Sequence, residues 1–347
     1  MDPATSHQEE EEEEERAQLR SRYNEAVSDL LQALESEPKA AYSSDDLAEL
    51  GVVLASFNPE NPSFLESKAC LFKPISSTKL EGFSVSRSDL PEGSRYWYNE
   101  FDEIYDDPTH VGHSSFSYVI RARAEQIFRY LRVYYTSLKK KSGRDVDLFE
   151  EFDGWNHIRE GNSFLDGGMG LLYGRCRGVP RWEIRAEREW QDDDSETTSP
   201  HIMLVVCTQD DAKADELLFG ELGSITQAIR NRLDQKEFEK TSLFPVLAIS
   251  FFGPRHGRLL QANFTKSGIL KVRVSPIYSF VRQAEAPFDL FLRYYACDPQ
   301  DGPEYEFYSD EEDAPTQAPE YVSPSTESEK ENLPPKEYDD TPSVEES

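Results

Sequence analysis

The chain has 347 residues, of which 37% are hydrophobic and 12% aromatic, so it can bury a sizeable core. Its formal net charge of −30 is concentrated at the ends: eight acidic residues oppose one arginine in residues 1–16, and sixteen oppose two lysines in residues 299–347. No run approaches the ~18 apolar residues of a membrane span, no apolar signal segment stands near the N-terminus, and the four cysteines form no CxxC pair. The composition therefore excludes a membrane-spanning chain, a disulfide scaffold and a zinc finger. We expect an intracellular protein, in the cytoplasm or nucleus.

The N-terminal part of the chain is predicted to be acidic and then helical. Residues 1–15 end in seven consecutive glutamates, whose mutual repulsion predicts a disordered arm. Residues 16–58 form a predicted helical section, because apolar residues recur at steps of three and four from Arg16 until Pro38. A second helix is predicted over 44–57, capped by Ser43 or Ser44. These two helices either pack on the main domain as a hairpin or dimerise.

Residues 59–298 are predicted to form an α+β domain with a mixed or antiparallel sheet. The clearest helix covers 115–139, where the apolar residues share one arc. Arg121, Arg129 and Arg132 fall on the adjoining arc. Such a basic stripe can bind an anion, a partner or the chain's own acidic tails, but it is more often a solvated face. No aromatic platform or glycine-rich loop accompanies it, so a nucleic-acid partner is not expected.

The second half of the domain contains the strands. Residues 181–190 alternate apolar and charged side chains, which predicts a strand with one charged face, paired with a buried strand at 201–208. A helix is predicted over 214–233. Three apolar runs then predict an antiparallel meander at 246–252, 258–264 and 269–274, and Pro287 opens a closing helix.

The turn between the first two strands of that meander, Gly253 to Arg258, is the most distinctive polar cluster. Arg255, His256 and Arg258 on a flexible turn can bind an anion or a partner. Alternatively, glycine and proline only make the turn, and both arginines point to water. We favour the second interpretation, because such turns need these residues whatever the function.

One enzyme family deserves comparison. The predicted order of helix 115–139, three strands, helix 214–233 and strand 246–252 resembles the α-β-β-β-α-β core of the PD-(D/E)XK nuclease-like superfamily. The resemblance implies a Mg²⁺ site formed by Glu125, Asp166 and Glu183, with Arg185 where the family has its lysine. Arginine cannot lose its proton to act as a base. The resemblance therefore implies a degenerate site, and Mg²⁺ is expected only under this alternative.

A second resemblance covers residues 200–298. The segment PVLAISFFGPRHGRLLQA, followed by YSF and APFDLFLRY, is similar to uncharacterised proteins of filamentous fungi. This resemblance implies a domain of that family but no activity.

Residues 299–347 are predicted to form a disordered, proline-rich acidic tail. Ser309 precedes an acidic run that an acid-directed kinase accepts, and Ser323 and Thr341 each precede a proline. Lys330, Glu331 and Asn332 form a KEN-box pattern, which a ubiquitin ligase reads. A tail that only improves solubility explains the same composition.

These observations together assign no catalytic residue and no cofactor. We therefore expect a non-enzymatic interaction protein with regulatory acidic tails, and keep the degenerate nuclease-like fold as the alternative. The sequence does not identify the protein partner.

Overall fold

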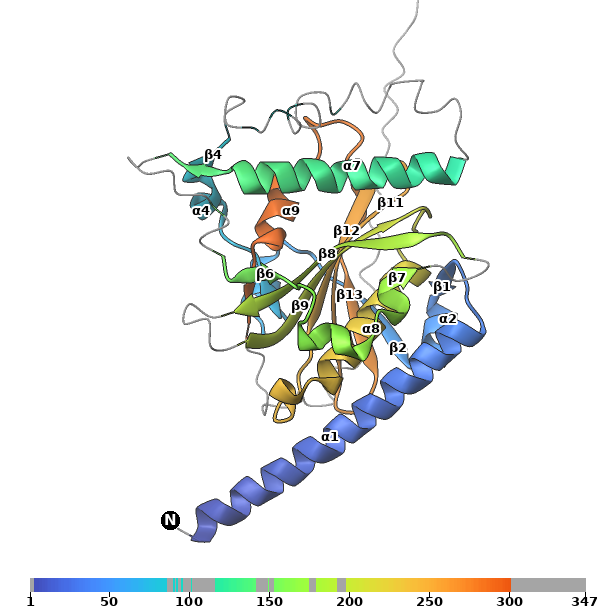
Figure 1. Cartoon of the computed structure of the whole chain (residues 1–347), viewed down its shortest axis with the longest axis vertical. Coiled ribbons are helices and arrows are strands. Elements are labelled where there is room, and N and C mark those ends of the chain that lie inside the picture. The colour runs from blue at the N-terminus through green and yellow to red at the C-terminus, as the bar shows by residue number, and fades with distance from the viewer. Residues whose placement is uncertain are drawn as a thin grey trace, which may run out of the picture. The chain divides into compact units, whose positions relative to one another are not determined.

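The computed structural model describes residues 3–85, 90, 92, 95, 101, 116–141, 149, 153–174, 179–191 and 198–300. Within these ranges, the side chains of 3–12, 116–121 and 173–174 are not described. The fold is α+β, as predicted: helices pack against both faces of a mixed sheet (Figure 1). None of the described helices is long and apolar enough to cross a membrane.

The sheet runs through the middle of the domain. In spatial order its strands are β2 (Val52–Ser56), β13 (Leu270–Val274), β12 (His256–Phe264), β11 (Val246–Phe252), β9 (Thr198–Thr208), β8 (Trp182–Gln191) and β6 (Trp155–His157). Two short strands extend it, since β14 (Tyr278–Ser279) pairs with β12 and β7 (Tyr173–Gly174) pairs with β8. The other short elements are β3 (Phe72–Lys73) paired with β15 (Asp298–Pro299), β4 (Phe83–Ser84) paired with β5 (Lys139–Lys140), the helices α3 (Pro62–Leu65) and α4 (Ser77–Glu81), and the 3₁₀ turns η4 (Ser163–Gly167), η5 (Gly170–Leu172) and η6 (Lys236–Phe238).

The strand connections confirm the predicted meander and hairpin. Strands β11, β12 and β13 pair antiparallel in succession, and β8 pairs antiparallel with β9. All seven residues of β11 are buried, as its unbroken apolar run predicts for a strand covered on both faces. Strand β9 runs parallel to β11, and α8 (Phe219–Asp234) makes the crossover between them. This helix begins later than the predicted residue 214, because β10 (Glu216–Leu218) first pairs with β1 (Ala41–Ser43).

Two hydrophobic cores lie on opposite faces of the sheet. Helices α1 (Pro3–Ser36) and α8 contribute to one core. Helices α7 (Phe116–Ser137) and α9 (Phe288–Tyr295) contribute to the other. Figure 1 shows α7 crossing the upper end of the sheet and α1 passing below it. Helix α7 confirms the helix predicted over 115–139, and α9 begins directly after Pro287, as predicted.

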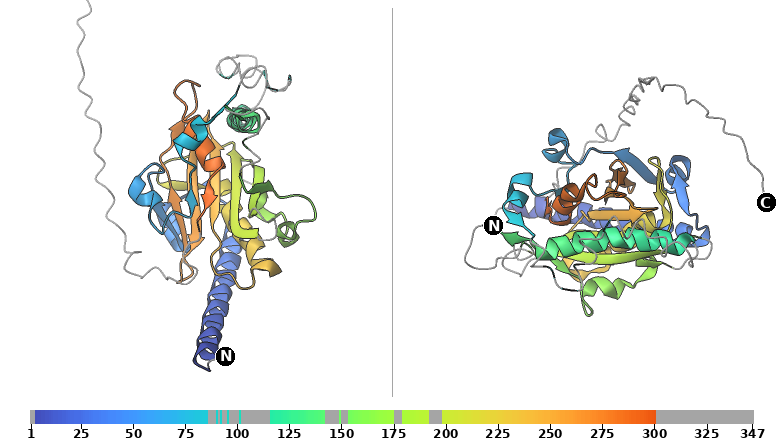
Figure 2. Two further views of the ribbon diagram at one scale, coloured as in Figure 1. Left: turned by 90° about the vertical axis from the view of Figure 1, so that its left-hand side faces the viewer. Right: turned by 90° about the horizontal axis from the view of Figure 1, so that it is seen from above.

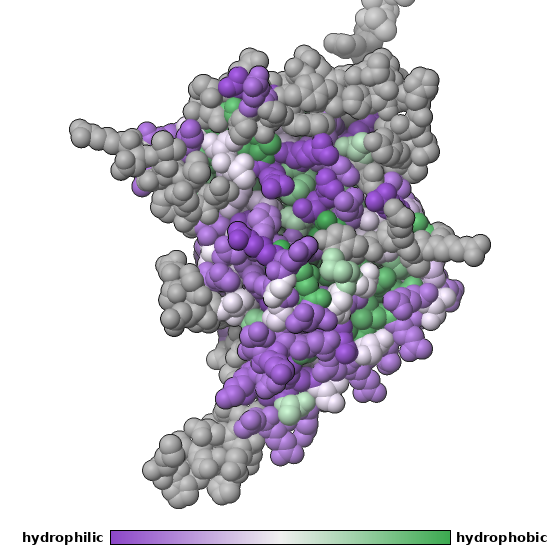
Figure 3. Space-filling view, in the orientation of Figure 1, coloured by the Kyte–Doolittle hydropathy of each residue, from purple (hydrophilic) through white to green (hydrophobic). Residues whose placement is uncertain are grey.

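Helix α1 packs with only part of its length. Its buried residues recur every three or four positions: Leu19, Tyr23, Val27, Leu30 and Leu34. Glu13, Glu14 and Glu15 are exposed, and Figure 2 shows this end of the helix projecting beyond the sheet. The helix begins before Arg16, where the sequence placed its start, and so includes the glutamate run. On the face shown in Figure 3, the visible surface of α1 is largely hydrophilic.

The predicted second helix over 44–57 is wrong in its second half. Ser43 does cap α2 (Ser44–Glu49), in a capping box with Asp46, but the helix ends there. Gly51 then adopts a left-handed φ of 69°, which turns the chain, and residues 52–56 form β2. Parallel pairing with β13 explains why the strand prevails over a helix. Two adjacent β-branched residues, Val52 and Val53, favour the same outcome.

A fully buried ion pair joins the sheet to α8. Arg258 on β12 and Glu221 in the first turn of α8 are both 0% exposed, with Nε and Oε1 2.9 Å apart. The guanidinium also donates to the carbonyls of Lys213 and Glu216 at 2.9 Å, and the Glu221 carboxylate accepts from the N–H of Leu218. The expectation that Arg258 points to water is therefore wrong. Desolvation of the pair is compensated by hydrogen bonds that fix the entry of the chain into α8.

Replacing Arg258 by methionine leaves the Glu221 carboxylate buried without its cation. We therefore expect Arg258→Met to lower the free energy of unfolding by about 3–5 kcal/mol, measured by urea unfolding. The matched control is Arg230→Gln, which removes a more exposed pair with Asp234 on the same helix. That change should cost at most ~1 kcal/mol. Equal losses in the two variants would contradict a special role for the buried pair.

Candidate functional site

The arginines of the Gly253–Arg258 turn are used inside the protein. Arg255 has a left-handed φ of 74° and is 0% exposed. Its guanidinium lies over the Phe101 ring, 3.9 Å from the centroid, and donates to the Phe101 carbonyl and to Gln126 on α7. The expectation that Arg255 points to water is therefore wrong, as it is for Arg258. Both guanidinium groups are turned inward, away from an external anion, whereas His256 is half-buried.

The predicted basic stripe lies on α7. Arg129 and Arg132 are exposed, and Arg129 forms an ion pair with Glu125 one turn earlier, at 3.5 Å. Arg121 lies in the first part of α7, where only the backbone is described. The exposure of Arg129 and Arg132 agrees with a solvated face. Their contact with a partner stays a prediction.

The three acids of the nuclease-like pattern do not converge. Glu125 on α7 and Glu183 on β8 both pair with Arg185, at 3.5 and 2.6 Å, so an arginine lies between the two carboxylates. Asp166 is exposed in η4, whose Phe164 and Leu165 pack in the α1/α8 core on the opposite face of the sheet. Among the described residues, no group of three or more His, Cys, Asp or Glu is placed to hold a metal ion.

A buried polar network that the sequence did not reveal holds the α7/α9 core together. Arg188 on β8 donates to the Tyr135 hydroxyl at 2.9 Å, to Asp153 at 3.2 Å and to the Tyr295 carbonyl at 2.9 Å. Its guanidinium also lies over the Tyr135 and Tyr295 rings, 5.2 and 4.6 Å from their centroids. Burial raises the pKa of Asp153 above its usual value despite the nearby guanidinium.

A bulge in β8 overturns the prediction of one charged face, formed by Glu183, Arg185, Glu187 and Glu189, on residues 181–190: Glu189 is buried and pairs with Arg232 on α8. The pairing of β8 with β9 shifts between Ile184 and Ala186. Before this bulge Trp182 and Ile184 face the α1/α8 core, whereas Ala186 faces the α7/α9 core. A bulge reverses the alternation of faces, so the charged side chains do not all meet solvent.

A serine and a histidine also come together, on β9. Ser199 Oγ and His201 Nδ1 are 2.6 Å apart, and His201 Nε2 lies 3.1 Å from the Gln300 carbonyl. Both contacts suit a neutral ring in which Nε2 donates and Nδ1 accepts. Burial is the main cause that lowers the pKa of His201 to about 3. Such a ring is a poor general base at neutral pH, so the pair has the character of a core contact and not of a catalytic dyad.

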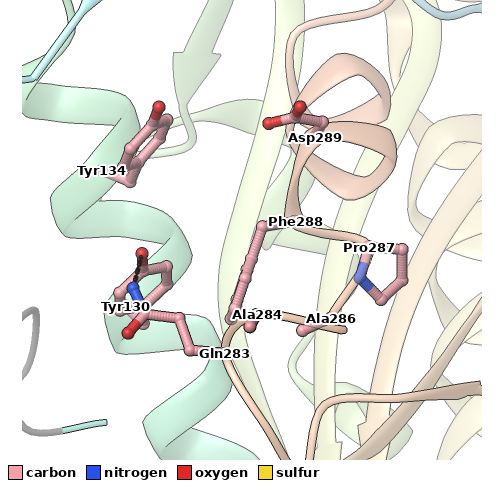
Figure 4. Close-up of a pocket in the computed structure, with 8 residues that line it drawn as sticks. All are labelled: Tyr130, Tyr134, Gln283, Ala284, Ala286, Pro287, Phe288 and Asp289. Atoms are coloured by element: carbon pink, nitrogen blue, oxygen red, sulfur yellow. Dashed lines mark hydrogen bonds between the residues drawn. The ribbon is translucent and has the colours of Figure 1, made fainter.

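The side chains that face an accessible space lie elsewhere, around a pocket of about 540 Å³ between α7 and the start of α9 (Figure 4). Tyr130 and Tyr134, one turn apart on α7, line one side, and Phe288 and Asp289 line the other. Gln283 closes the base, where its amide donates to the Tyr130 hydroxyl at 2.7 Å. Local sequence patterns do not indicate this site, because residues about 150 positions apart meet only in the folded protein.

The surface elsewhere offers few apolar contacts. Among the described residues, the exposed large hydrophobic side chains are Val53 and Met169, on separate elements. The pocket is therefore the described feature whose size and aromatic lining suit a ligand.

The neutral state of His201 predicts a pH dependence of stability. In the unfolded chain its pKa is near the ordinary value of about 6.5, so the unfolded state binds more protons below that pH. Stability should therefore fall as the pH drops from about 6.5 toward 3. We expect His201→Gln to lack this loss. Between pH 7.5 and pH 5, the free energy of unfolding should therefore fall by about 2 kcal/mol more in the wild type than in the variant. Urea unfolding at both pH values measures the difference, and parallel losses would contradict it.

The tail residues Ser309, Ser323, Lys330, Glu331, Asn332 and Thr341 lie outside the described part of the chain. Comparison of the chain with protein-family models, with curated proteins and with solved structures gave no match.

Proposed function

We propose that this chain is a non-enzymatic, intracellular interaction protein that binds a protein partner in the α7/α9 pocket. The observation that carries the proposal is the pocket itself, an open space of about 540 Å³ lined by aromatic rings, an amide and a carboxylate. Pockets of this size that combine apolar walls with a few polar groups are the usual sites of specific binding. Aromatic side chains are also enriched where proteins contact one another.

The packing around the pocket supports a preformed binding site. The ring centroids of Tyr130 and Phe288 are 4.3 Å apart. Phe288 also packs edge to face against Phe280, with 5.2 Å between the centroids. Leu290 and Phe291, which follow directly in α9, are buried in the core. Because these walls are held by the core, a partner loses little free energy in ordering them.

The acidic regions belong to the same proposal. The glutamates at the projecting end of α1 and the tail beyond residue 298 give the chain most of its negative charge. A strongly negative chain attracts cationic partners and repels anionic ones. In this proposal, modification at Ser309, Ser323 or Thr341 adjusts partner binding, and the Lys330–Asn332 motif adjusts turnover through a ubiquitin ligase.

Selection of a displayed random-peptide library against the full chain tests the binding role. We expect enriched peptides whose affinity falls at least about tenfold for Tyr134→Ala/Phe288→Ala, because the variant removes two aromatic walls. The matched control is Tyr278→Ala, which removes an aromatic side chain outside the pocket, from β14. The melting temperature of each variant shows that it is folded. Enriched peptides that bind all three proteins equally, or no enrichment, would contradict the proposal.

A second candidate is the degenerate nuclease-like fold. When the short strands β5, β7 and β10 are left out, the order is α7, β6, β8, β9, α8 and β11, with β9 and β11 parallel. This order supports the candidate, because it is the α-β-β-β-α-β order of that superfamily. The separation of Asp166 from Glu125 and Glu183 weighs against a working Mg²⁺ site. This second candidate therefore proposes a fold shared with the superfamily, without its nuclease activity.

Thermal unfolding with Mg²⁺ or Mn²⁺ tests this second candidate. A cation that binds only the folded state raises the melting temperature in proportion to its occupancy. Because Arg185 already lies between Glu125 and Glu183, we expect no shift in either the wild type or Asp166→Ala/Glu183→Ala. A rise of several degrees that the double substitution abolishes would restore the metal site and overturn the non-enzymatic proposal.

A further inference from the structure

We propose that the α7/α9 pocket binds a cationic side chain, arginine or lysine, presented by an extended segment of the partner. This inference rests on the proposed function and adds the chemistry of the partner. It follows from two features of the pocket, the aromatic rings and the carboxylate at its edge, and from the net negative charge of the chain.

The aromatic rings provide surfaces that attract a cation. The Tyr130 and Tyr134 rings are nearly parallel, with centroids 6.4 Å apart and an angle of 16° between their planes. The Phe288 ring lies 4.3 Å from Tyr130. Tyr130 is buried in the side of the pocket formed by α7, whereas Tyr134 and Phe288 are partly exposed. An ammonium or guanidinium group within about 6 Å of such rings is attracted by their electron-rich faces.

The carboxylate of Asp289 gives the pocket a negative charge. Asp289 is exposed in the first turn of α9, and Figure 4 shows its oxygens directed toward the side of the pocket formed by α7. Within the described part of the chain, no lysine, arginine or histidine forms an ion pair with it. A carboxylate beside aromatic walls favours a ligand with a positive group and an apolar stem, which describes both arginine and lysine.

Charge and size further restrict the class of ligand that fits the pocket. The formal charge of −30, most of which lies in the terminal regions, disfavours the approach of an anionic ligand to the chain as a whole and favours that of a cationic one. A neutral apolar side chain would bury the Asp289 carboxylate without a partner, which costs free energy. A volume of about 540 Å³ also exceeds what one side chain fills, so the flanking residues of an extended segment fit beside the cation.

The inference is tested by measuring the binding of acetyl-arginine amide to the full chain with ligand-observed NMR at physiological salt. The neutral comparison is acetyl-citrulline amide, which keeps the shape and loses the charge. We expect the arginine probe to bind about tenfold more tightly than the citrulline probe. Acetyl-trimethyllysine amide, a cation without N–H donors on its head group, should also bind more tightly than citrulline if the rings contribute.

Three variants test which residues cause the preference for the arginine probe over the citrulline probe. Asp289→Asn removes the carboxylate and Phe288→Leu removes a ring while keeping an apolar side chain; each should reduce the preference for arginine at least about threefold. Glu285→Gln is the matched control, because it removes an exposed charge next to the pocket without lining it. Its preference should equal that of the wild type. Melting temperatures show whether each variant is folded.

Two results would overturn the inference. Equal affinities for the arginine and citrulline probes would show that the positive charge of the ligand does not contribute to binding. A preference for arginine that persists in both Asp289→Asn and Phe288→Leu would assign it to the general acidity of the chain. If the library nevertheless yields peptides that need Tyr134 and Phe288 but contain no required cation, the proposed function stands and only this inference fails. If no such peptides emerge, the binding role itself fails.

Discussion

The buried pair of Arg258 and Glu221 is the interaction on which the arrangement of the sheet and α8 depends. The two charges leave water completely, so each needs the other. Because Arg258 also binds the carbonyls of Lys213 and Glu216, the pair fixes the segment that leads from β9 into α8. That segment decides where α8 begins, and α8 in turn sets the parallel pairing of β9 with β11.

Buried arginines perform a comparable role on the opposite face. Arg255 joins the turn between β11 and β12 to Gln126 on α7, and Arg188 joins β8 to Tyr135 on α7 and to the backbone of α9. Both use aromatic rings as well as hydrogen bonds, which suits a core rich in tyrosine and phenylalanine. The two helices that form the pocket are therefore attached to the same sheet by fixed contacts. A pocket built this way keeps its shape before a ligand arrives.

The fold could be predicted from the sequence wherever the signal was local. The apolar runs of the meander and the periodic pattern of α7 depend on neighbouring residues, and both predictions were confirmed. Strand β2 was missed because it forms by pairing with β13, more than 200 residues away. The burial of Arg255 and Arg258 was missed for the same reason, since their partners Gln126 and Glu221 lie far from them in the chain. The pocket was missed because Tyr130 and Phe288 reveal no common role until the helices meet.

The distribution of the polar groups among the described residues is the reason why we propose recognition and not catalysis. Catalysis by acids and bases needs titratable groups that reach a substrate and have a pKa suited to the reaction. His201 and Asp153 are buried in cores, and burial shifts the pKa of each toward its neutral form. Glu125 and Glu183 are engaged by Arg185. Asp289 differs from all of these, because its carboxylate is exposed beside aromatic rings and is not part of a core network. A carboxylate placed in this way can stabilise a cation without the desolvation that makes buried charges costly, which is the chemistry that the proposed binding site requires.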